Sequence, residues 1–161
     1  MCALSLGSLA LTLPGCGPDS VVETSKMPDE ADFAAVSEAL GVRCGSLDCH
    51  GMAERNFRLY GRYGLRWSDT DVPGGSETSG DEHHENYLSL ISLEPEALAQ
   101  VTEGAPVTRL TLVRKARGAE VHKGGSPFPK GTAGDSCLVS WLEGQVDHAS
   151  CSQAAQLLQR P

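Results

Sequence analysis

The stretch FAAVSEALGVRCGSLDCHG, residues 33–51, joins an apolar stripe to a cysteine pair and a histidine. Phe33, Val36 and Leu40 recur at the spacing of a helix. Such spacing puts one apolar face against a protein core, so we expect an amphipathic helix here, ended by Gly41. The cysteine pair then falls in the loop that follows the helix.

Cys44 and Cys49 are separated by four residues, and His50 follows the second cysteine directly. Three kinds of site use these residue types: a covalently attached haem, a small zinc or copper site, and a short disulfide loop beside an incidental histidine. Haem attachment uses two thiols as thioethers and the next histidine as an iron ligand. The familiar motif has two residues between the cysteines, and Gly45 and Ser46 are suited to a bulge that accommodates two more.

A second pair of motifs lies near the C-terminal end of the chain. RLTLVRKARGAEVHKGGSPF, residues 109–128, precedes GDSCLVSWLEG, residues 134–144. The order of the two regions, from residue 30 to about 145, resembles a class I c-type cytochrome-like domain of an exported bacterial lipoprotein. In such domains a helix with Leu and Lys leads to an H-x-G-G loop, and a final helix carries a tryptophan. The resemblance implies a cytochrome c-like helical domain whose first and last helices cross near Phe33 and Trp141.

The resemblance also implies roles for individual residues. Cys44 and Cys49 would form the thioethers of a haem c, His50 would be the proximal iron ligand, and His122 is the candidate distal ligand. A loop-stabilising role is the alternative for His122. Met27, Met52 and His148 are weaker candidates for the distal position. Arg58, Arg62 and Arg66 either pair with the haem carboxylates or are ordinary surface charge.

The rest of the chain favours an all-α class, because strand-like alternation is scarce. We expect a polar surface loop over 68–86 and a helix from about 85 to 93. Further helices are expected from 94 onward, over 108–116, from Asp135 to about 146, and over 153–160. The DEHHE segment, 81–85, is expected to be part of the loop, with a divalent-cation site as the alternative.

The first residues indicate export. Leu4–Leu13 is an apolar run too short to span a bilayer, and Leu13-Pro14-Gly15-Cys16 is similar to a bacterial lipobox. We therefore expect a signal peptide over 1–16, lipidation at Cys16 and a tether over 17–28. A domain over 29–150 and a C-terminal tail over 151–161 would follow. Cys137 and Cys151 flank one expected helix, and a disulfide between them is the plain interpretation.

Composition narrows the function further. The 161-residue chain has a formal net charge of −8, which argues against nucleic-acid binding and permits a basic protein partner. We find no catalytic motif, so an enzyme is not expected. The sequence predicts an electron-transfer protein with one haem at the periplasmic face of a bacterial membrane or at the cell surface. The alternative is a haem-free, disulfide-stapled structural or binding lipoprotein with the same fold.

Overall fold

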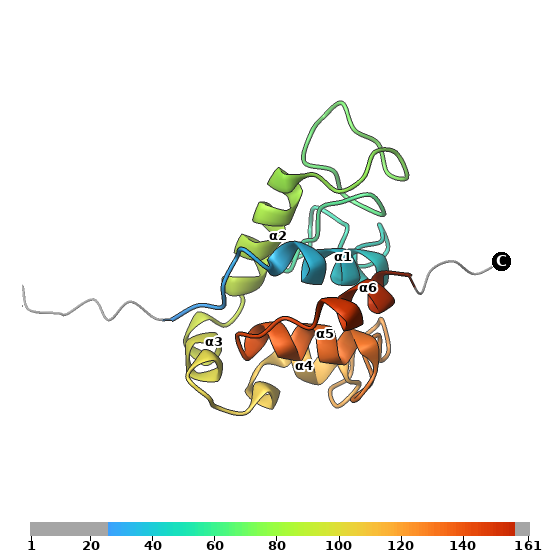
Figure 1. The fold of residues 1–161 in the computed structure, drawn as a ribbon. Helices are drawn as coiled ribbons and strands as arrows, with labels where there is room; N and C mark the ends of the chain where they lie inside the picture. Colours follow the sequence, from blue (N-terminus) through green and yellow to red (C-terminus); the bar gives the residue numbers. More distant parts are fainter. Residues whose placement is uncertain (1–25, 157–161) are drawn as a thin grey trace, which may run out of the picture.

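The computed structural model describes residues 26–156, and within that range the protein is helical (Figure 1). The elements are α1 (Phe33–Cys44), α2 (Gly80–Ile91), α3 (Pro95–Thr102), the 3-10 turn η1 (Val107–Arg109), α4 (Thr111–Ala116), α5 (Ala133–Leu142) and α6 (His148–Gln156). Extended pairing in these residues is limited to an isolated bridge between Tyr60 and Leu65. The all-α class expected from the sequence is confirmed.

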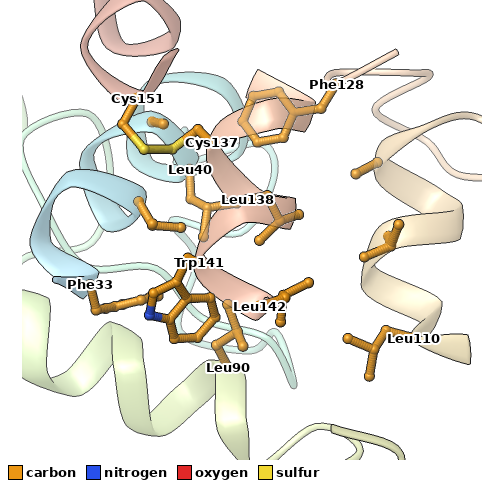
Figure 2. Packing of buried hydrophobic residues seen from close by; sticks show 14 of the residues in the cluster. Phe33, Leu40, Leu90, Leu110, Phe128, Cys137, Leu138, Trp141, Leu142 and Cys151 are labelled. Carbon is orange, nitrogen blue, oxygen red and sulfur yellow. A yellow bond between two sulfur atoms is a disulfide. The ribbon is translucent and has the colours of Figure 1, made fainter. Parts of the chain in front are cut away.

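Helix α1 lies at the centre of the packing and contacts α2, α5 and α6. Phe33 at its start packs against Trp141 of α5, with ring centroids 4.8 Å apart and an angle of 50° between the rings (Figure 2). The Trp141 indole N–H donates to the carbonyl of Asp29 at 2.7 Å. Both side chains are 1% exposed. The contact expected between Phe33 and Trp141 is therefore present, and it fixes the start of α1 against α5.

Helix α1 runs one turn further than its sequence suggests. It ends at Cys44 rather than at Gly41, because the Gly45 amide still donates to the Gly41 carbonyl at 2.9 Å and Val42 is buried in the core. Packing of that last turn outweighs the weak helix propensity of one glycine. Cys44 is consequently the last residue of the helix.

Helix α2 begins at Gly80, so the expectation that the surface loop extends to residue 86 is wrong. Ser79 and Glu82 form a capping box: the Ser79 side chain accepts from the Glu82 amide, and the Glu82 carboxylate accepts from the Ser79 amide. This reciprocal pair satisfies two of the free N–H groups at the start of a helix. The DEHHE segment therefore forms the first turns of α2.

The helix expected from Asp135 begins two residues earlier, at Ala133. Thr132 occupies the N-cap position of α5. The Asp135 carboxylate instead accepts from the Gly131 amide at 2.9 Å and from Arg117 Nε at 2.6 Å. The side chain is thus used to attach α5 to the end of α4.

Both edges of the domain extend beyond the expected boundaries. Pro28 is buried, its carbonyl accepts from the Tyr87 hydroxyl at 3.0 Å, and the Lys26 carbonyl accepts from the Thr102 hydroxyl at 2.6 Å. At the other end α6 carries Cys151 and Ala154 into the core, at 1% and 0% exposure. Residues 26–28 and 151–156 therefore belong to the packed domain rather than to a tether and a tail. The expected signal peptide and Cys16 lie outside the described residues.

Candidate haem site

A cavity of about 600 Å³ opens between the end of α1, residues 48–57, the start of α3, helix α4 and residues 122–127. Its volume falls within the range of sites for small ligands and cofactors. Leu40, Phe57 and Leu112 contribute apolar wall. The cavity is lined by all four residues that the sequence assigns to the haem: Cys44, Cys49, His50 and His122.

The cysteine loop folds back on the end of α1. The Cys49 amide donates to the Ser46 carbonyl at 2.9 Å, and the His50 amide donates to the Cys44 carbonyl at 2.8 Å. The extra residues between the cysteines are thus taken up in a turn at the helix end. Both thiols are free. Burial, and to a lesser degree the nearby Cys49, raises the pKa of Cys44 to about 12, so this thiol is neutral at ordinary pH.

Three glycines hold the loop in place by direct backbone contact. A Cβ at Gly51 would lie 1.9 Å from the Gly45 carbonyl oxygen, and a Cβ at Gly64 would meet the same oxygen at the same distance. Real side chains never approach so closely. The glycine after His50 is therefore required by packing, because the segments of Gly45, Gly51 and Gly64 cross without room for a methyl group.

His50 is oriented by its own loop. Its Nδ1 lies 2.9 Å from the Phe57 carbonyl oxygen. A carbonyl oxygen only accepts, so Nδ1 carries the proton and Nε2 has a free lone pair. Burial lowers the pKa of His50, and His122, Arg55 and Lys115 lower it further, against the hydrogen bond to Phe57. The imidazole is thus neutral, which is the form that binds metal ions.

His122 faces His50 from the opposite part of the chain. The two ring centroids are 5.8 Å apart, and the ring planes differ by 12°. A Cβ at Gly124 would lie 2.8 Å from His122 Cε1, so glycine at that position leaves room for the ring. The buried Nδ1 of His122 has no hydrogen-bond partner among the described residues. A buried nitrogen without a hydrogen-bond partner is unfavourable.

These observations fit a haem. The two imidazoles border the same cavity with near-parallel rings whose centroids are 5.8 Å apart, so both are available to one group bound there. The free thiols of Cys44 and Cys49 are the groups that attach a haem covalently, and the apolar walls suit its ring.

The weaker distal candidates do not line the cavity. Met52 is 40% exposed, and Met27 packs against the core. His148 lies at the start of α6, where its Nε2 is 3.7 Å from Asp32. Among these residues and His122, only His122 borders the same space as His50.

The arginines named from the sequence are also elsewhere. Arg62 pairs with Glu77, Arg66 pairs with Glu82 inside the protein, and Arg58 lines a separate hollow beside α2. The cationic residues at the cavity are Arg55, Lys115 and Lys123, which the sequence did not single out. None of Arg58, Arg62 and Arg66 borders the cavity.

No group of three or more histidine, cysteine or acidic side chains converges on a metal position within residues 26–156. The histidines of the DEHHE segment bind different partners on the N-terminal side of the domain. His83 Nδ1 contacts the Ser37 hydroxyl at 2.9 Å, and His84 Nδ1 contacts Glu30 at 2.6 Å. The imidazoles thus attach α2 to α1 and to the segment before it, and the divalent-cation alternative has no geometric support.

The other cysteine pair forms a disulfide. Cys137 of α5 and Cys151 of α6 are joined, with Cα atoms 4.7 Å apart (Figure 2).

In residues 26–156, no helix has the length and apolar character needed to cross a membrane. Comparison with family models, curated proteins and solved structures finds no match to this chain.

Proposed function

We propose that this chain is an electron-transfer protein with one covalently bound c-type haem in the cavity between α1 and α4. The observation that carries the proposal is the convergence of two distant motifs. Cys44, Cys49 and His50 come from one motif and His122 from the other, and all four border one cavity. The helix arrangement, with α1 packed on α5 and α6, would then be that of a cytochrome c-like domain.

The residues divide the work of holding the group. Cys44 and Cys49 attach it as thioethers, His50 Nε2 is the proximal ligand and His122 is the distal ligand. The Phe57 carbonyl fixes the ring of His50 through Nδ1, as outer partners of metal-binding histidines do. The haem, when bound, supplies an iron that gains and loses one electron. Electron transfer needs no further catalytic residue, so the proposal does not include an enzyme activity.

We also propose that the protein is exported and lipid-anchored at Cys16, on the periplasmic face of a bacterial membrane or at the cell surface. The lipobox-like sequence before Cys16 supports the anchor. The Cys137–Cys151 disulfide is consistent with an oxidising compartment. The net charge of −8 favours a basic redox partner, bound in a salt-sensitive encounter.

A pyridine haemochrome spectrum tests the proposal. The full chain is produced in a host with periplasmic cytochrome c maturation, denatured and extracted with acidified organic solvent. An absorption band that stays with the polypeptide is the expected result. A colourless protein with Cys44 and Cys49 bridged in a peptide map contradicts it and supports the haem-free structural or binding lipoprotein.

Variants assign the ligands. His50→Ala should abolish stable haem incorporation, whereas His122→Ala should keep the haem and convert its spectrum to a five-coordinate form. His148→Ala is the matched control, because His148 is an exposed histidine outside the cavity. If His122→Ala and His148→Ala give the same six-coordinate spectrum, His122 is not the distal ligand.

A further inference from the structure

The loop between residues 61 and 79 reverses the usual placement of polar and apolar side chains. The Arg66 side chain is 3% exposed, whereas the next residue, Trp67, is 50% exposed. Buried charge beside an exposed aromatic is informative, because the opposite arrangement is the norm. The loop projects from the helices beyond the start of α2, on the side of α1 away from α4 (Figure 1).

The buried charge is fully paired. The Glu82 carboxylate, also buried, accepts from Arg66 Nε at 2.8 Å, from the Trp67 amide at 3.1 Å and from the Ser79 amide at 2.9 Å. Burial alone raises the pKa of Glu82, but the hydrogen bonds from Arg66, Ser79 and Trp67 outweigh it and lower the pKa. One carboxylate thus fixes the arginine, the tryptophan backbone and the start of α2.

The arginine in turn holds the rest of the loop. Its guanidinium donates to the carbonyls of Ser76 and Glu77, at 2.9 Å and 3.2 Å. A buried ion pair adds little net stability over an apolar replacement, but it fixes one geometry when all its donors and acceptors are used. The hydrogen bonds of Arg66 and Glu82 therefore hold the loop in one conformation, in which Trp67 lies at the surface.

Trp67 rests edge-on against Tyr60, with ring centroids 5.3 Å apart and an angle of 87° between the rings. Tyr63 and Val72 of the same loop are exposed by 39% and 64%. None of Tyr63, Trp67 and Val72 borders the haem cavity. Rigidly held, exposed aromatic side chains are typical anchors of protein interfaces, since little entropy is lost when they bind.

The charge around Trp67 selects the partner. Residues 68–85 contain six acidic residues and no lysine or arginine. Arg62 and Arg66, which precede them, are already paired with Glu77 and Glu82. Among the described residues, Asp69, Asp81 and Glu85 have no ion pair. Asp69 follows the exposed indole by two residues in the sequence. An exposed indole in an acidic segment favours a guanidinium, which stacks on the ring and pairs with carboxylates.

We propose that Trp67 and the acidic residues around it form a docking surface for an arginine-rich segment of a protein partner. The proposal does not depend on haem, because neither Trp67 nor Asp69 borders the cavity. Trp67 supplies the stacking surface and Asp69 supplies charge, while Glu82, paired with Arg66, holds the backbone amide of Trp67.

The test uses the full chain and a fluorescently labelled nona-arginine peptide, with Kd measured by anisotropy at fixed salt. Trp67→Ala and Trp67→Leu should each weaken binding roughly two- to thirtyfold, the range of one cation–aromatic contact. Asp69→Asn should weaken it by a smaller factor. Nona-lysine should bind more weakly than nona-arginine, because lysine lacks the planar group that stacks.

Two matched controls separate docking from general charge attraction. Glu54→Gln removes an exposed carboxylate at the cavity, and Val121→Ala trims a side chain that is 98% exposed. Both should leave Kd unchanged within about twofold. The proposal is overturned if nona-arginine does not bind, if Glu54→Gln weakens binding as much as Asp69→Asn, or if both Trp67 variants bind like the wild type. Unchanged thermal melting of the Trp67 variants verifies that the fold is intact.

Discussion

The two cysteine pairs of this chain differ, because one forms a disulfide and the other does not. Cys137 and Cys151 are 14 residues apart, both almost fully buried, and bonded across α5 and α6. Cys44 and Cys49 are much closer in sequence, yet both remain free thiols. Proximity along the chain therefore does not decide which cysteines are paired in this structure.

The surroundings explain the difference. Cys137 and Cys151 lie in the core where α5 and α6 pack directly against each other. Cys44 and Cys49 border an open cavity, and the loop between them is held by backbone hydrogen bonds and glycine contacts. Cys137 and Cys151 are part of the packed core, whereas the thiols of Cys44 and Cys49 are free to react with a group bound in the cavity. The following predictions test this division.

The largest expected effect is loss of the disulfide. In the oxidised, haem-free protein, replacing Cys137 and Cys151 together by alanine should lower the free energy of unfolding by about 3 kcal/mol, the value for a loop of this length. The bridge restricts the unfolded chain, and its sulfur atoms fill core space. Urea unfolding followed by circular dichroism measures the change.

The matched control replaces Cys44 and Cys49 together by alanine. This double variant should change the free energy of unfolding by less than about 1 kcal/mol, because neither thiol forms a bond and a cavity already lies beside them. In the maturation host the same variant should lose all covalent haem. Equal destabilisation by the two double variants would show that the division between the pairs is wrong.

Much of the fold follows from the sequence. The stripe of Phe33, Val36 and Leu40 and the all-α class could be predicted, because helical spacing of apolar residues is a strong local signal. The contact of Phe33 with Trp141 was expected only from the family resemblance. Helix ends were predicted less well. Gly41 continues α1, since packing of the following turn outweighs its local preference.

The start of α2 was missed although its signal is in the sequence. Ser79 and Glu82 have the spacing of a capping box, but the acidic, glycine-rich surroundings favoured a loop. The second role of Glu82 could not be predicted, because its partner Arg66 is brought to it only by the fold. The same holds for Gly64, which meets Gly45 and Gly51 through a chain crossing that no local pattern encodes.

The residues of the candidate site could be predicted from sequence motifs, whereas their arrangement in space could not. His50 follows a cysteine, and His122 lies in a glycine-rich loop, so each was singled out locally. Their near-parallel rings and their shared cavity depend on the fold, which brings the end of α1 and helix α4 to the walls of one cavity. Arg55, a cation at the cavity, carries no motif and could be found only in the structure, whereas Lys115 belongs to the second motif but was given no role at the site.

An intermediate effect is expected at the glycine crossing beside the free thiols. Gly51→Ala should destabilise the haem-free protein by roughly 1–3 kcal/mol, as overpacking of a close contact does. The added methyl group would meet the Gly45 carbonyl, so the loop that carries Cys49 and His50 must shift. In the maturation host we expect a reduced yield of covalent haem, measured by the haemochrome band.

Gly41→Ala is the control for that substitution. It lies within α1, and a Cβ there meets no atom within 4 Å. Alanine is the better helix former, so this variant should be more stable than the wild type by roughly 0.5–1 kcal/mol. If Gly51→Ala behaves like Gly41→Ala, the crossing does not hold the cysteine loop.

The smallest expected effect is a dependence of the free energy of unfolding on pH that comes from the Cys44 thiol. Burial raises the pKa of Cys44 from 9.0 to about 12. Above pH 9 the unfolded chain ionises this thiol while the folded protein keeps its proton, so stability falls as pH rises from 9 towards 12. Between pH 8 and 10 the haem-free wild type should therefore lose about 1 kcal/mol more than Cys44→Ala in urea unfolding. Equal losses would contradict the burial of Cys44. A thioether has no such proton, so haem attachment through Cys44 should remove the difference.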